Sequence, residues 1–188
     1  MATASMVNVR QLDLTFTHTQ TINVDMKNNP CSLSGRHGLF MDIENVAGAP
    51  LPASLRIEAV KEELRSHFED FDSAQLVVAC NHKAMKTVAF HFDSALLRQR
   101  SGRDGADDAL LEEMADLRVM ARYDRITLCS GDGKFTAAVA QLGAMGIETT
   151  VVAIEGHLSK ALAMAAHHVV LLKPLDEEPG AGELQVAA

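Results

Sequence analysis

The spacing of apolar and polar residues divides this chain into two parts. Between residues 7 and 26 apolar and polar positions alternate one by one, which is typical of extended β structure. Leu12, Leu14 and Phe16 share one face of this segment, with Asp13 and Thr15 on the other. Because the segment is long for a single strand, we expect a hairpin near residues 18–20, followed by a loop.

From residue 38 onward, short apolar runs alternate with segments of helical period. The strands predicted from this pattern cover residues 38–43, 74–80, 124–130, 147–154 and 168–172, with a short strand or loop at 95–102. The predicted helices cover residues 55–68 (capped by Ser54), 82–92, 106–123, 134–146 and 157–167. Strands alternating with helices predict a doubly wound α/β domain with a mainly parallel sheet.

Composition adds limits to this picture. The chain of 188 residues fits an N-terminal β segment and loop at 1–34, one α/β domain at 35–173, and an acidic flexible tail at 174–188. A formal charge of −8 disfavours broad electrostatic coating of nucleic acid. The three cysteines show no metal-binding spacing, and neither a secretion signal nor a membrane span is recognisable. These features predict a cytoplasmic protein.

Acidic residues stand where predicted strands end. Asp42 follows a buried strand directly, and Asp132 lies in a Gly-flanked turn after another strand. Asp107 and Asp108 open a predicted helix. Because ligands of such sheets bind at the carboxyl ends of the strands, these carboxylates are expected to converge there. A divalent cation relieves their repulsion, and oxygen ligands suit Mg²⁺ or Mn²⁺, which can activate water for phosphodiester hydrolysis.

Each acidic residue also has a purely structural interpretation. Asp107 or Asp108 can cap a helix, and Asp132 can serve as an ordinary turn residue. Asp42 is harder to explain in this way, because a carboxylate beside a buried strand is costly. A third interpretation is a nucleotide-binding loop in "SGDGKF", which is disfavoured because Thr136 stands where a third glycine is needed.

With these residues in place, the segments "GLFMDIENV", "GADDALLEEM" and "DRITLCSGDGKF" together resemble the NYN domains, a branch of the PIN-like nuclease superfamily. The resemblance extends over residues 38–172 and implies a three-layer α/β/α fold and metal-dependent endonuclease chemistry, most often on RNA. It implies a metal held by Asp42, Asp107 and Asp132. By the same resemblance, Asn45 orients Asp42 or a metal-bound water, and Ser130 helps to shape the pocket.

Two positions depart from the family pattern. The turn usually carries a second acid where this chain has Lys134, and the final helix usually ends in an aspartate where this chain has His167. Lys134 either weakens metal binding or contacts a substrate phosphate directly. Arg98 and Arg100 precede the middle motif and are candidates for phosphate contacts, or form a solvated loop. Glu113 matches a less regular acidic position of the family.

The function favoured by these patterns is a metal-dependent endoribonuclease that acts through Mg²⁺ or Mn²⁺ on the aspartates, with RNA, including single-stranded RNA, as the candidate substrate. The alternative is a catalytically degenerate NYN domain that binds RNA or a protein without cutting it, and Lys134 is the residue that favours it. The apolar face of residues 7–26 needs a cover, which predicts a homo-oligomer contact through that segment.

Overall fold

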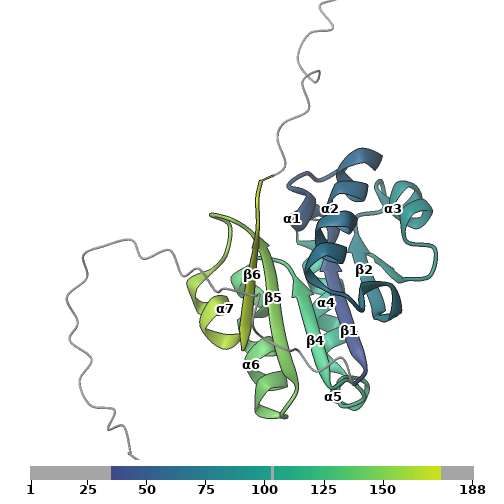
Figure 1. Ribbon diagram of the computed structural model, residues 1–188. Coiled ribbons are helices and arrows are strands. Elements are labelled where there is room, and N and C mark those ends of the chain that lie inside the picture. The colour runs from purple at the N-terminus through teal and green to yellow at the C-terminus, as the bar shows by residue number, and fades with distance from the viewer. Residues whose placement is uncertain (1–34, 103, 175–188) are drawn as a thin grey trace, which may run out of the picture.

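The computed structural model describes residues 35–102 and 104–174, which form one parallel sheet with helices on both faces (Figure 1). The six strands lie in the order β3-β2-β1-β4-β5-β6. Their bounds are β1 (His37–Asp42), β2 (Gln75–Cys80), β3 (Leu96–Gln99), β4 (Arg125–Cys129), β5 (Glu148–Ile154) and β6 (His168–Leu172). The predicted three-layer, parallel α/β/α architecture is confirmed.

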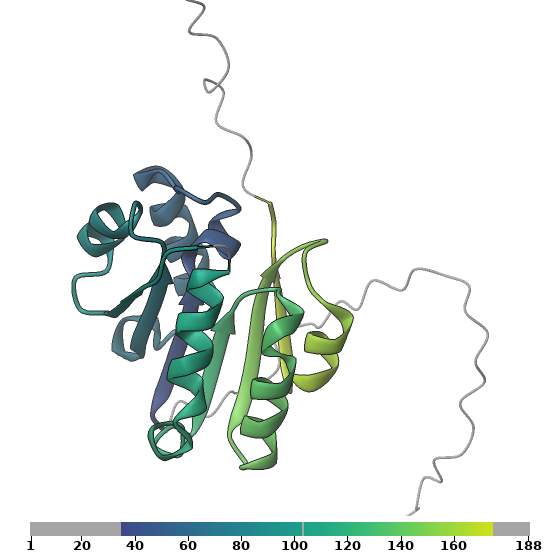
Figure 2. The ribbon, with the colours of Figure 1, turned by 180° about the vertical axis from the view of Figure 1, so that it is seen from behind.

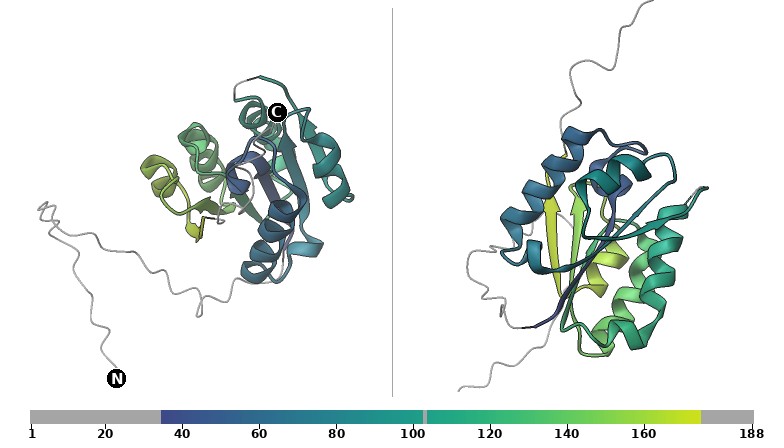
Figure 3. Two further views of the ribbon diagram at one scale, coloured as in Figure 1. Left: turned by 90° about the horizontal axis from the view of Figure 1, so that it is seen from above. Right: turned by 90° about the vertical axis from the view of Figure 1, so that its right-hand side faces the viewer.

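The helices separate into two layers because alternate strand residues point to opposite faces of the sheet. They are α1 (Ile43–Ala47), α2 (Ser54–His67), α3 (Met85–His91), α4 (Gly105–Ala115), α5 (Leu117–Met120), α6 (Thr136–Ala144) and α7 (Lys160–Ala165), with 3-10 turns η2 (Phe71–Ser73) and η3 (Gly133–Phe135). Leu39 and Met41 face a core shared with α1, α2 and α3. Phe40 faces the core under α4, α5, α6 and α7, the layer seen in Figure 2. Figure 3 shows helices on both sides of the sheet from above.

The chain reverses direction across the sheet between β1 and β4. From β1 it winds outward through β2 to β3, returns through α4, and then winds outward the other way through β4, β5 and β6. β1 and β4 are neighbours, with Met41 opposite Cys129. The carboxyl ends of these two strands are therefore the topological switch point, where open α/β sheets form ligand sites.

Two local predictions were wrong. The segment 106–123 forms two helices rather than one, because the side chain of Asp116 accepts hydrogen bonds from the backbone N–H groups of Arg118 and Val119 and starts α5. Ser54 is the first residue of α2 rather than its cap, and Ala53 at the N-cap supplies no side-chain hydrogen bond. The predicted β hairpin within residues 7–26 and the acidic tail lie outside the described residues.

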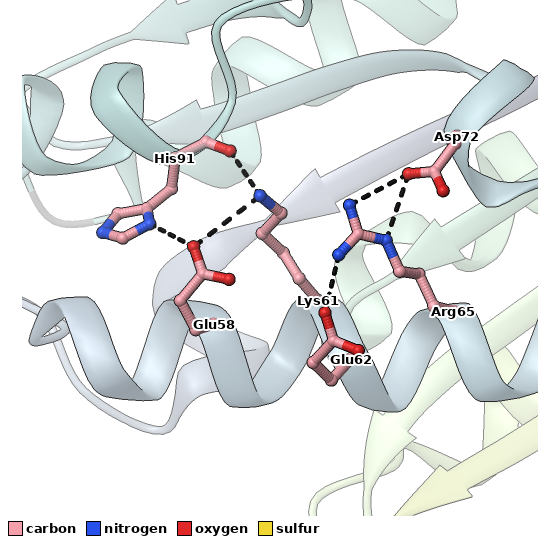
Figure 4. Close-up of polar contacts among 6 residues, drawn as sticks. All are labelled: Glu58, Lys61, Glu62, Arg65, Asp72 and His91. Atoms are coloured by element: carbon pink, nitrogen blue, oxygen red, sulfur yellow. Dashed lines mark hydrogen bonds and ion pairs between the residues drawn. The ribbon is translucent and has the colours of Figure 1, made fainter.

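Polar contacts fasten α2 to its neighbours (Figure 4). Glu58 accepts a hydrogen bond from His91 Nδ1 at 2.5 Å, and Lys61 Nζ donates to the His91 carbonyl at the end of α3 at 2.7 Å. Arg65 bridges Glu62 and Asp72. These ion pairs position helices and lie outside the acidic edge described below. Within the described ranges, no helix has the length and apolar character needed to cross a membrane.

Candidate active site

Asp42 ends β1 and also starts the next helix. Its Oδ1 atom accepts hydrogen bonds from the backbone N–H groups of Glu44 at 3.0 Å and Asn45 at 3.3 Å, so it is the N-cap of α1. The residue is 5% exposed. The carboxylate is thus held rigidly at the switch point, and only part of its hydrogen-bonding capacity is used by the cap.

Asp107 reaches the same place from the first turn of α4 and is 7% exposed. Its Oδ1 atom is buried and receives no hydrogen bond from a fixed donor. Burial raises the pKa of Asp42 to about 8, and the hydrogen bond with Asp107 and the negative charge of Asp107 contribute to this shift. Burial also raises the pKa of Asp107. Because two close, buried carboxylates cannot both ionise cheaply, the pair retains a proton near neutral pH unless a cation binds.

The turn after β4 brings Asp132 to the same edge. Asp132 Oδ1 accepts a hydrogen bond from the backbone N–H of Lys134 at 2.9 Å, and its negative charge contributes to the raised pKa of Asp107. Ser130 is fully buried, and its Oγ accepts from the backbone N–H of Asp132 at 3.3 Å. The Asn45 side chain accepts from Gly131 N at 3.0 Å. Asn45 and Ser130 therefore shape the turn that carries Asp132.

Lys134 brings a positive charge to this group of carboxylates. Its Nζ atom lies 2.8 Å from Asp104 Oδ2 and 3.5 Å from Asp107 Oδ2. The hydrogen bond to Asp104 is the main reason why the pKa of Lys134 is raised. Sequence reasoning missed Asp104, which precedes α4 in a left-handed backbone conformation with φ of 64°. Its signal was the D-G pair at residues 104–105, which is typical of such backbone geometry.

Oxygen-only donors and a buried carboxylate oxygen without a donor at Asp107 fit a hard divalent ion such as Mg²⁺ or Mn²⁺. The fit is incomplete in one respect. Among the residues that the structure describes, no three His, Cys, Asp or Glu side chains are grouped closely enough to hold a metal together. Asp42 and Asp107 contact each other, and the Lys134 ammonium lies 3.5 Å from the Oδ2 atom of Asp107.

The other candidate residues have partners of their own. Arg98 Nε donates to Glu113 Oε2 at 2.8 Å, and Arg100 Nη1 donates to Glu112 Oε1 at 2.5 Å. Arg98 on β3 and Arg100 just after it are thus both paired with glutamates of α4. His167, at the position of the family's last aspartate, contacts Thr149 N and Oγ1 through Nδ1 and ties β5 to the segment before β6. It fixes the edge of the sheet.

Glu44 turns away from the Asp42–Asp107 pair. Its Oε1 accepts a hydrogen bond from the backbone N–H of Asn81 at 2.6 Å, at the end of β2. This contact links α1 to the neighbouring strand end.

Comparison with known proteins identifies the family of this chain. The family model described as the NYN domain matches residues 36–173. The chain therefore belongs to the NYN domain family, within the PIN-like superfamily. Among solved structures, the fold is similar to that of a protein of unknown function from Vibrio parahaemolyticus, at 17% identity and a TM-score of 0.49, over 74% of this chain and 93% of that chain. No curated protein matches the chain significantly.

Proposed function

We propose that this protein is a metal-dependent endoribonuclease that hydrolyses phosphodiester bonds of RNA. The observation that carries the proposal is the meeting of two buried carboxylates, Asp42 and Asp107, at the switch point of a PIN-like sheet. Such a pair is costly to a fold unless it binds a cation. Membership of a nuclease superfamily supports the same chemistry.

Each site residue has a distinct role in this proposal. Asp42, Asp107 and Asp132 would hold the ion, Mg²⁺ or Mn²⁺. Asn45 and Ser130 keep that turn in position through Gly131 N and Asp132 N. When bound, the divalent ion would lower the pKa of a water molecule and stabilise the charge that develops on the phosphate.

A second candidate function is an NYN domain that binds RNA or a protein without cutting it. The ion pair between Lys134 and Asp107 favours it, because the ammonium contacts one oxygen of a residue that the nuclease would need as a metal ligand. The two functions differ in their dependence on a divalent ion. Cleavage that requires Mn²⁺ or Mg²⁺ identifies the nuclease, whereas RNA binding that is unchanged by EDTA identifies the binding module.

The test combines metal binding and cleavage on the same samples. Mn²⁺ and Mg²⁺ are titrated by calorimetry into the wild type and Asp42→Asn, and a labelled single-stranded RNA is incubated with each. The nuclease proposal predicts binding and cleavage in the wild type and loss of both in the variant. Absence of both in the wild type would refute the nuclease proposal.

Light scattering on the full chain tests the homo-oligomer predicted from residues 7–26, and a monomer would refute it.

A further inference from the structure

The side chain of Lys134 connects the two loops that carry the acidic residues. Lys134 lies in η3, yet its ammonium contacts Asp104 Oδ2 at 2.8 Å and Asp107 Oδ2 at 3.5 Å, both at the start of α4. We propose that Lys134 is an internal cation that neutralises these carboxylates in the metal-free protein, and that a divalent ion has to displace it from Asp107. This inference rests on the proposed function, because it concerns the same metal site.

The surroundings of the ammonium allow displacement. The side chain of Lys134 is 37% exposed and that of Asp104 45%, whereas that of Asp107 is only 10% exposed. The lysine thus reaches inward from the surface on a flexible stem and can swing back into solvent without disturbing the core. Asp107 cannot follow it, because its residue is buried on α4.

The backbone of Asp104 gives independent support. Among the described residues, Asp104 is the one residue other than glycine with a positive φ, 64°. For an L-residue this conformation costs roughly 1–2 kcal/mol and persists where surrounding contacts hold it. In this conformation the Asp104 carboxylate lies 2.8 Å from the Lys134 ammonium.

The electrostatic consequence has a definite sign. The Lys134 ammonium lies 3.5 Å from Asp107 Oδ2, so it would repel a divalent ion held by Asp42 and Asp107. Replacing lysine by the uncharged methionine keeps the length of the side chain and removes the competing charge. We therefore expect Lys134→Met to bind divalent ions about tenfold or more tightly than the wild type, since each factor of ten corresponds to about 1.4 kcal/mol.

The experiment measures metal binding rather than activity. Mn²⁺ is titrated by calorimetry into the full chain of the wild type, Lys134→Met and Lys134→Arg, and melting temperatures are recorded in EDTA and in saturating Mn²⁺. Lys83→Met is the matched control, because Lys83 is also exposed and the change removes the same charge from the protein. Lys134→Gln serves as a second neutral variant should the methionine variant fail to fold.

The expected result has two parts. Lys134→Met, or Lys134→Gln, binds Mn²⁺ more tightly but melts at a lower temperature than the wild type in EDTA, because its carboxylates have lost their cation. Lys134→Arg and Lys83→Met behave like the wild type. Equal or weaker Mn²⁺ binding in the neutral variants, with binding in the wild type, overturns the inference and leaves the nuclease proposal intact. Absence of Mn²⁺ binding in the wild type and in every variant overturns both.

Discussion

The carboxylates of Asp42 and Asp107 meet at one buried edge of the sheet although they come from β1 and α4. Each residue is less than a tenth exposed, and their proximity helps to raise the pKa of Asp42 to about 8. Asp42 is in addition the N-cap of α1. The same side chain therefore stabilises a helix through its hydrogen bonds and destabilises the metal-free protein through its charge.

Asp42→Asn separates these two contributions. Asparagine caps a helix as well as aspartate, so the variant keeps the start of α1 and loses only the charge. The pKa of Asp42 is raised from 3.8 to about 8 in the folded protein. The free energy of unfolding therefore falls as the pH rises from about 3.8 to about 8, because the unfolded chain ionises Asp42 more easily. In EDTA we expect the variant to be more stable than the wild type at pH 8.5, by on the order of 2 kcal/mol, and closer to it at pH 5. Urea denaturation at the two pH values measures the difference.

The control for this prediction is Asp116→Asn. Asp116 is likewise an N-cap, of α5, but it stands at the end of α4, whereas Asp107 stands in the first turn of that helix. Its replacement should leave the pH dependence of the wild type unchanged. A stability difference between Asp42→Asn and the wild type that does not vary with pH would contradict the assignment of a raised pKa to Asp42.

The sheet was predictable from the sequence because its strands are short apolar runs separated by segments of helical period. The break between α4 and α5 was not, since apolar residues continue across it at helical spacing. The stop depends on one side chain, Asp116, which binds the N–H groups ahead of it. An aspartate at this point of the sequence fits either the exposed face of one long helix or the N-cap of a new helix, and the sequence pattern does not distinguish the two.

The acidic edge was predictable in part for a similar reason. Parallel strands place their carboxyl ends together, so the positions of Asp42 and Asp132 followed from the order of elements. The ion pair between Lys134 and Asp104 did not follow, because it depends on a left-handed backbone at Asp104 and on the path of a long side chain. The pairing of Arg98 with Glu113 depends in the same way on how α4 packs beside β3.

Gly131 is required by the turn that carries Asp132. A Cβ atom at this position would lie 2.2 Å from the backbone oxygen of His157, and the Gly131 carbonyl accepts from Ser159 N at 2.9 Å. Gly131→Ala has to push two loops apart and is expected to lower the free energy of unfolding by about 3 kcal/mol, in the range of severe packing defects. Thermal and urea denaturation measure this loss.

Gly146→Ala is the comparison for that variant. Gly146 has a φ of 81°, but a Cβ atom there meets no atom within 4 Å. Alanine at this position suffers backbone strain alone, about 1 kcal/mol. If the two variants lost equal stability, the steric conflict assigned to Gly131 would be incorrect.

Asp70 holds together the amino ends of β1 and β4, opposite the acidic edge. Its Oδ2 atom accepts hydrogen bonds from His37 Nδ1 at 3.1 Å and Arg125 Nη2 at 2.5 Å, and both partners are buried. Asp70→Asn removes the negative charge from a buried ion pair and is expected to lower the free energy of unfolding by about 3 kcal/mol, measured by urea denaturation.

Asp72→Asn is the control for Asp70→Asn. Asp72 pairs with Arg65 at the surface, so the loss of its charge should leave the urea midpoint unchanged. Equal effects would show that burial does not strengthen the Asp70 contacts.

Variants of Arg100 and its partner can show whether RNA binds beside the acidic residues. Its guanidinium pairs with Glu112, whose side chain is 72% exposed, so the pair can open at low cost. If Arg100 contacts a phosphate, Arg100→Ala reduces the slope of log affinity against log salt concentration by about one. Glu112→Gln releases the arginine from its partner and should tighten binding. Fluorescence anisotropy with a labelled single-stranded RNA, in EDTA to prevent cleavage, measures both variants between about 50 and 200 mM salt, because affinity that depends on phosphate contacts falls steeply over this range. Unchanged slopes in both variants would restrict Arg100 to its contact with α4.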